Sequence, residues 1–173
     1  MSRFSSRVIH ALGLMALFLG AIRASADGPP ASPGPCPEEG DVVVVISQRR
    51  QLWLCHQGAA VAKYRVALGR GGIDKRREGD GRTPLGTYTL GTPRPSAQFG
   101  MFIPIDYPTP DQAAQGFTGS EVGIHRPPRG LTEPEYPITT VNWTRGCIAT
   151  ALDADILFIA AFVRAGQTTL VIR

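Results

Sequence analysis

One cysteine and one histidine in the last third of the chain are the residues best suited to covalent chemistry. Cys147 stands in "NWTRGCIAT", residues 142–150, and His125 lies 22 positions earlier in "GIHR". A free thiol has a pKa of about 8.5, so it needs a base or a positive field nearby to act as a nucleophile. The spacing allows two neighbouring loops to bring the imidazole and the thiol together. A buried structural cysteine and an ordinary loop histidine remain the alternative.

The residues around Cys147 favour the nucleophile. Gly146 has no Cβ where a substrate must approach, and the main-chain N–H groups of Gly146 and Cys147 can face an oxyanion. A helix predicted over residues 151–163 would add partial positive charge nearby. These features indicate a site that stabilises negative charge beside a thiol.

Short apolar runs between turn residues predict the elements that would hold this site. A three-strand meander is expected over residues 42–68, and further strands in "TYTLGTP", "FGMFIPIDYP", "EVGIHR" and "TTLVIR". "TPDQAAQGF" predicts a helical turn or two. The main helix, residues 151–163, has Thr150 and Asp153 in the positions of a capping box. The pattern predicts a mostly-β domain, a sandwich or small barrel that carries one main helix.

No cofactor or metal is expected. The glycine-rich loop "GRGGIDKRREGDGRTPLG" lacks the Gly-x4-Gly-Lys-Ser/Thr pattern of a phosphate-binding loop. A zinc site would also need close ligand spacing. The candidate ligands do not show it: Cys55, His56, His125 and Cys147.

The first 26 residues resemble a secretory signal peptide. Arg3 and Arg7 precede an apolar run over residues 11–22, and Ala24-Ser25-Ala26 supplies a small-x-small cleavage site. A membrane anchor is the alternative, but the run is shorter than the roughly 18–20 apolar residues that span a bilayer. We therefore expect cleavage after Ala26, then a proline- and glycine-rich lead-in over residues 27–41 and one domain over residues 42–173.

Loss of residues 1–26 changes the charge of the protein. Three basic residues leave with that segment, so 15 basic and 14 acidic residues remain and the net charge falls from +4 to +1. The high isoelectric point of the full chain therefore gives no support for binding to nucleic acid. No stable membrane insertion is expected once the segment is removed.

Export also places the three cysteines in an oxidising compartment, where thiols tend to pair. Cys36 precedes the first predicted strand and Cys55 lies near the end of the second. An antiparallel hairpin would bring these two positions together. We therefore expect a Cys36–Cys55 disulfide, which leaves Cys147 as a free thiol.

Several motifs together resemble those of one enzyme family. "GIHR" followed by "TRGCIA" resembles the paired histidine and Ser/Thr-x-Gly-Cys signatures of the L,D-transpeptidase catalytic domain, also called the YkuD domain. "REGDGRTPLGTYTL" is similar to the family's Lys/Arg-x-Gly-Asp-x-x-Thr-Pro-x-Gly-x-Tyr segment, and "IDYPTPDQAAQG" to its Tyr-Pro-x-x-x-Asp segment. The resemblance covers residues 42–173.

The resemblance implies a periplasmic or secreted enzyme that acts on peptidoglycan stem peptides during wall synthesis and the maintenance of cell shape. Cys147 would form a thioester with release of D-alanine, and His125 would serve as general base and acid. Main-chain N–H groups at Gly146 and Cys147 would hold the oxyanion. Thr144 and Arg145 would shape the pocket for the donor peptide. An acceptor amine would then give a 3→3 cross-link, and carbapenems would acylate the same thiol.

Three positions depart from the common family pattern: Arg126, Arg145 and Ala149 stand where many relatives have glycine, histidine and arginine. These changes concern substrate handling rather than the thiol and the imidazole. If water is the acceptor, the protein is an L,D-carboxypeptidase or a hydrolase of stem peptides or wall-attached protein. A third reading is a non-catalytic wall-binding scaffold.

Overall fold

The computed structural model describes residues 34–128, 138–164 and 166–173. The chain divides into two units, Met1–Ala31 and Ser32–Arg173, and all described residues belong to the second. The predicted signal peptide, residues 1–26, and residues 27–33 of the lead-in lie outside the described residues. Within the described ranges, no helix is long and apolar enough to cross a membrane.

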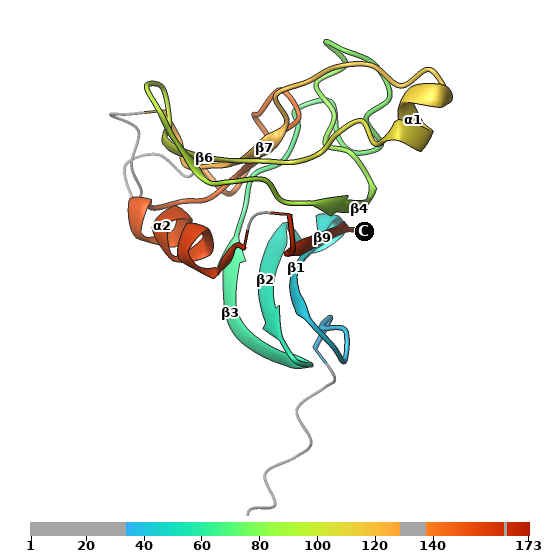
Figure 1. Ribbon diagram of the computed structural model, residues 1–173. Coiled ribbons are helices and arrows are strands. Elements are labelled where there is room, and N and C mark those ends of the chain that lie inside the picture. The colour runs from blue at the N-terminus through green and yellow to red at the C-terminus, as the bar shows by residue number, and fades with distance from the viewer. Residues whose placement is uncertain (1–33, 129–137, 165) are drawn as a thin grey trace, which may run out of the picture. The chain divides into compact units, whose positions relative to one another are not determined.

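The larger sheet contains the predicted meander and the last strand of the chain (Figure 1). Its central strand pairs antiparallel with one neighbour and parallel with the other, which is the strand that ends the chain. In spatial order the strands are β3 (Ala59–Arg65), β2 (Gln51–His56), β1 (Asp41–Ile46), β9 (Thr169–Ile172) and β4 (Gly86–Thr89).

The run of valines in β1 follows from its central place. Val43 and Val45 belong to the main hydrophobic core on one face, while Val42 and Val44 pack with Cys55 on the other. A strand covered on both faces reads as a continuous apolar run rather than as alternating apolar and polar residues.

The smaller sheet positions the candidate site. It includes two strands that were expected, β6 (Gly100–Pro104) and β7 (Gly123–His125), and two short ones that were not, β5 (Arg94–Ser96) and β8 (Ile148–Ala149). The spatial order is β5-β6-β7-β8, with β7 and β8 parallel. The predicted fold class, mostly strands in two sheets with few helices, is confirmed.

A single main core joins both sheets and the larger helix. Each large aliphatic side chain that is fully buried contributes about 1.5–3 kcal/mol to folding. The fully buried members include Leu52 and Leu54 of β2, Ile103 of β6, Ile124 of β7, Ile148 of β8, and Ile156 and Ile159 of the helix. Ile124, beside His125, and Ile148, beside Cys147, therefore anchor the two candidate residues to the core.

The two helices begin differently from one another. α1 (Pro110–Ala114) has a capping box, in which Thr109 and Gln112 exchange side-chain to main-chain hydrogen bonds of 3.3 and 3.1 Å. α2 (Asp153–Phe162) is the predicted main helix, but the capping box expected from Thr150 and Asp153 is wrong.

The correct start of α2 lies two residues beyond the predicted one. The main-chain N–H of Leu152 donates to Asp155 Oδ2 at 3.2 Å, so Asp155 supplies the carboxylate of the first turn. Asp153 turns away and pairs with Arg126 at 2.6 Å. Asp153, which the local pattern assigned to the helix cap, therefore forms a long-range ion pair instead.

Cys36 and Cys55, the pair expected to be joined, form a disulfide with a Cα–Cα distance of 5.4 Å. Val42 of β1 lies opposite Cys55 of β2, so the hairpin brings the chain before β1 alongside β2. Cys147 is a free cysteine.

Candidate active site

Strand register brings His125 and Cys147 to the same face of the smaller sheet. His125 pairs with Ala149, so Cys147, two positions earlier, lies opposite Gly123. Side chains alternate along strands, and neighbouring strands lie about 4.8 Å apart. The imidazole of β7 and the thiol of the residue just before β8 therefore project on one side of the sheet, while Ile124 points into the core.

One cavity of about 380 Å³ contains both groups. It also contains the two predicted substrate residues, Thr144 and Arg145. The sequence did not point to its other lining residues, which come from separate segments of the chain: Gln98, Phe99, Glu121 and Trp143.

His125 is enclosed by aromatic rings. It is only 2% exposed, and the ring of Phe99 stacks on it at 3.8 Å between centroids with 23° between the planes. Trp143 meets it edge-on at 6.0 Å, and its indole N–H donates to Ile138 O at 2.8 Å. Trp143 is half-buried and lines the cavity.

The carbonyl of Arg126 fixes the tautomer of His125. The Nδ1 atom lies 2.5 Å from Arg126 O. A carbonyl oxygen only accepts, so Nδ1 carries the hydrogen and Nε2 of the neutral ring is the basic nitrogen. Burial lowers the pKa of His125 to about 4, although the bond to Arg126 O acts in the opposite direction. The imidazole is therefore neutral at pH 7.

The thiol is also neutral at pH 7. Burial raises the pKa of Cys147, the Gly123 N–H and the charge of Lys75 oppose that rise, and the Glu121 carboxylate adds to it. The thiol donates to the main-chain carbonyl of Glu121 at 3.5 Å. The resting pair is thus thiol and imidazole, rather than thiolate and imidazolium.

The Thr144 hydroxyl holds the turn that carries the thiol. It donates to Cys147 O at 2.7 Å and accepts from the Gly146 N–H at 3.1 Å. Thr144 is 3% exposed, so most of this side chain serves the turn rather than the cavity. The Gly146 N–H, expected as an oxyanion donor, is directed at Thr144 in this structure.

Gly146 is required for packing. Its φ is +133°, and a Cβ at this position would lie 2.6 Å from Arg82 O. From the sequence, the missing Cβ was expected to leave space for the substrate, and this explanation is wrong. The space that a side chain would fill belongs to the main chain of Arg82.

Two residues of opposite charge line the same cavity. Arg145 is exposed and makes no ion pair with a carboxylate of residues 34–128, 138–164 or 166–173. Glu121, with a φ of +52°, pairs with Arg94 at 2.7 Å. A non-glycine residue with positive φ at a cavity is a conformation often found at functional sites.

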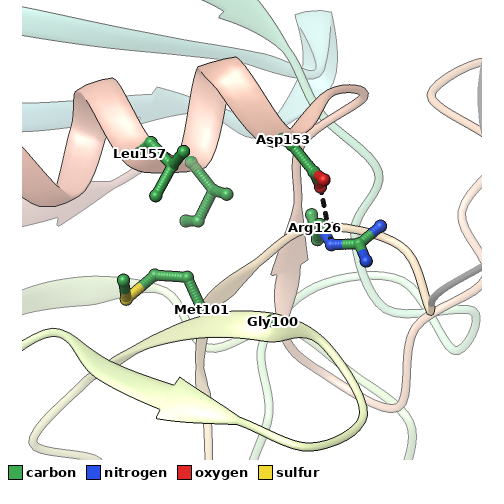
Figure 2. A pocket seen from close by; sticks show the side chains of 6 residues that line it. Gly100, Met101, Arg126, Asp153 and Leu157 are labelled. Atoms are coloured by element: carbon green, nitrogen blue, oxygen red, sulfur yellow. Dashed lines mark ion pairs between the residues drawn. The ribbon is translucent and has the colours of Figure 1, made fainter.

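A second cavity of about 310 Å³ lies beside α2 (Figure 2). Arg126, the residue after His125, lines it and pairs through Nε with Asp153 at 2.6 Å. Met101 and Leu157 face each other across it. Among the described residues, no group of three or more His, Cys, Asp or Glu side chains could hold a metal ion.

Solved structures with the same fold come from several bacteria. The helical cell shape determining protein Pgp2 from Campylobacter jejuni is 24% identical with a TM-score of 0.61, covering 76% of this chain and 46% of its own. Bdellovibrio bacteriovorus Bd1075 is 22% identical with a TM-score of 0.59, covering 78% and 48%. An L,D-transpeptidase from Mycobacterium tuberculosis is 16% identical with a TM-score of 0.54, covering 77% and 57%.

The chain thus spans about half the length of these relatives, and the likeness shows the fold. No curated protein sequence matches it. The profile of the L,D-transpeptidase catalytic domain (YkuD) matches residues 39–172. The chain belongs to the L,D-transpeptidase catalytic domain family.

Proposed function

We propose that this protein is an exported, cysteine-dependent L,D-transpeptidase that acts on peptidoglycan stem peptides. The observation that carries the proposal is the placement of Cys147 and His125 on one face of adjacent strands, inside one cavity. Family membership gives the reaction class, because family members act on the peptides of the cell wall. Residues 1–26 act as the signal peptide, and residues 42–173 form the catalytic domain.

The first half-reaction transfers the donor peptide to the enzyme. Cys147 Sγ attacks the carbonyl between the third residue of a tetrapeptide stem and its terminal D-alanine. His125 Nε2 takes the thiol proton during the attack, because both groups are neutral beforehand. The C–N bond then breaks, the proton passes to the leaving amine of D-alanine, and a thioester remains.

The second half-reaction releases the product. An amine of a neighbouring stem attacks the thioester, His125 Nε2 accepts the amine proton, and the proton returns to the sulfur as the C–S bond breaks. The product is a 3→3 cross-link. Because the bond to Arg126 O holds the ring in one tautomer, Nε2 stays available in both half-reactions.

Main-chain and side-chain groups of the cavity support these steps. The Cys147 N–H serves as the oxyanion donor, a contribution of about 3 kcal/mol in comparable sites. The exposed guanidinium of Arg145 binds a carboxylate of the donor stem, since no carboxylate of the described residues occupies it. Thr144 acts by holding the turn.

The proposed location is the periplasm or the exterior, at the cell wall. The Cys36–Cys55 disulfide supports it, because disulfides persist in oxidising compartments. One structural neighbour is described as a cell shape determining protein. We extend that role to this chain, whose cross-links would contribute to cell shape.

Intact-mass spectrometry of the mature protein with a carbapenem tests the nucleophile. A covalent adduct is expected on the native protein and none on Cys147→Ser. Digestion of peptidoglycan treated with the enzyme then identifies the acceptor. Cross-linked 3→3 dimers support transfer, and shortened monomers would replace it with a carboxypeptidase. A folded protein with no adduct and no product would leave only the scaffold reading.

A further inference from the structure

Lys75 lies beside the turn formed by Gly146 and Cys147, and it does not line the cavity that contains Cys147. The chain has 16 arginines and only two lysines, Lys63 and Lys75. Lys63 is exposed, whereas Lys75 is 4% exposed. An ammonium is almost never buried to this extent unless it is paired. The groups that surround Lys75 therefore indicate the role of its charge.

The ammonium of Lys75 is held in one place. It donates to Asp80 Oδ1 at 3.0 Å and to Arg77 O at 2.9 Å, and it lies 5.9 Å from the ring centroid of Tyr107. The Tyr107 hydroxyl donates to Lys75 O at 3.1 Å. Both ends of the residue are thus fixed by hydrogen bonds.

Asp80 is a fixed, ionised partner. Its oxygens accept the main-chain N–H groups of Arg76, Arg77 and Arg82 at 2.9, 3.0 and 3.0 Å. Burial raises the pKa of this carboxyl, but these N–H donors and Lys75 outweigh burial and hold its pKa well below the usual range. The loop therefore builds a rigid pair of charges.

The aliphatic part of the Lys75 side chain lies close to Gly146 of the turn. A Cβ on Gly146 would lie 3.8 Å from Lys75 Cδ, and one on Gly119 would lie 3.1 Å from Lys75 Cε. The same loop also binds the turn through main-chain hydrogen bonds. Arg70 N donates to Thr144 O at 2.9 Å, and Thr144 N donates to Leu68 O at 3.1 Å.

Several charged or titratable groups lie near the thiol on different elements. His125 and Arg145 line the same cavity, and Glu121, which faces it from the segment before β7, disfavours the thiolate. Lys75 is the side-chain cation whose charge favours the thiolate. Because this ammonium is buried, solvent and salt screen it less than they screen the exposed Arg145.

We propose that Lys75 is a positioning residue, which supports the Gly146–Cys147 turn with its stem and favours the developing thiolate with its fixed positive charge. This inference rests on the proposed role of Cys147 as the nucleophile. It gives the long loop before β4 a part in the chemistry, although that loop contributes nothing to the lining of the cavity.

The test is the pH profile of alkylation of Cys147 by iodoacetamide, compared between the native protein and Lys75→Met. Methionine keeps most of the stem and removes the charge. The midpoint is expected to rise, so the rate of alkylation at pH 7 should fall. Lys63→Met, which removes the other lysine, should leave the midpoint unchanged.

An unchanged midpoint in a folded Lys75→Met protein would overturn the inference, even if its stability or activity fell. If Lys75→Met does not fold, the native protein labelled with 15N-lysine provides a second measurement. Its two side-chain resonances should behave differently, that of Lys75 shifting with the midpoint of the thiol and that of Lys63 not shifting. A Lys75 resonance that ignores the thiol would overturn the inference as well.

The proposed function can fail separately from this inference. If Cys147→Ser retains acyl transfer, the nucleophile is wrong and the inference falls with it. If Cys147→Ser abolishes transfer while Lys75→Met keeps the native alkylation profile, only the role of Lys75 is lost.

Discussion

Two consecutive residues, His125 and Arg126, line two cavities of similar size with opposite chemistry. In the cavity beside α2, the charge of Arg126 is neutralised by Asp153 at 2.6 Å, and the facing side chains Met101 and Leu157 are apolar. The other cavity is lined by His125 and by Cys147, which is a free thiol. The two cavities therefore differ in the groups that line them and not in their volume. One is lined by a free thiol and a neutral imidazole, and the other by a neutralised ion pair and apolar side chains.

The largest effect should come from removing the thiol. Cys147→Ser is expected to reduce acyl transfer by about 10³-fold or more, because a hydroxyl is a far weaker nucleophile in a site built around a neutral base. Release of D-alanine from a tetrapeptide stem measures it, with circular dichroism as the check on folding. Leu157→Ala in the second cavity is the matched control, and a comparable loss there would erase the contrast between the cavities.

Gly146→Ala should disrupt the turn that carries Cys147. The added Cβ would lie 2.6 Å from Arg82 O at a φ of +133°, so the free energy of unfolding should fall by about 3 kcal/mol. Urea denaturation measures the change. Gly72→Ala is the control, because its φ is also positive but nothing lies within 4 Å of the added Cβ. Equal losses in the two variants would mean that backbone strain, and not the contact with Arg82, sets the requirement.

Acid should destabilise the protein through His125. Its pKa is lowered to about 4 in the folded state, against about 6.5 when unfolded. The unfolded chain therefore binds the proton first, and stability present above pH 6.5 is lost as the pH falls toward 4. The expected loss is about 3 kcal/mol.

Urea denaturation between pH 7 and pH 4 measures this loss, with His125→Phe as the comparison. The phenyl ring preserves the stack on Phe99 but cannot be protonated. Its stability should fall less over the same range. Parallel curves for His125→Phe and the native protein would contradict the assignment.

The smallest effect should come from the ion pair of the second cavity. Asp153→Asn leaves the guanidinium of Arg126 with a weaker partner, and Asp153 is 65% exposed, so the expected loss of stability is about 1 kcal/mol. Thermal unfolding measures it. The alkylation profile of Cys147 should not move. A shifted profile would show that the two cavities are coupled through the strand they share.

The sequence pointed to the two candidate catalytic residues better than to the residues that surround them. His125 and Cys147 were found from residue type and from a family resemblance that is now confirmed. Phe99, Glu121 and Trp143 were not placed at the site, because stacking and cavity lining depend on contacts between distant segments. No local pattern reports such contacts.

The errors in the elements have physical causes as well. β8 is two residues long, which is too short to show any periodicity, yet it fixes the register of the thiol. The capping box at Thr150 failed because Asp153 gains a partner in Arg126, 27 positions earlier in the chain. The longer strands and the helix were predicted, since apolar periodicity persists over enough residues to be recognised.

The pairing of β1 with β9 has a mechanical consequence. These strands are parallel neighbours in the middle of the larger sheet, so tension applied between the start of β1 and the end of β9 would load their hydrogen bonds together, in shear. The Cys36–Cys55 bond transfers part of any pull on the segment before β1 directly to β2. A pull along the chain would therefore have to break the β1–β9 hydrogen bonds together and not one after another.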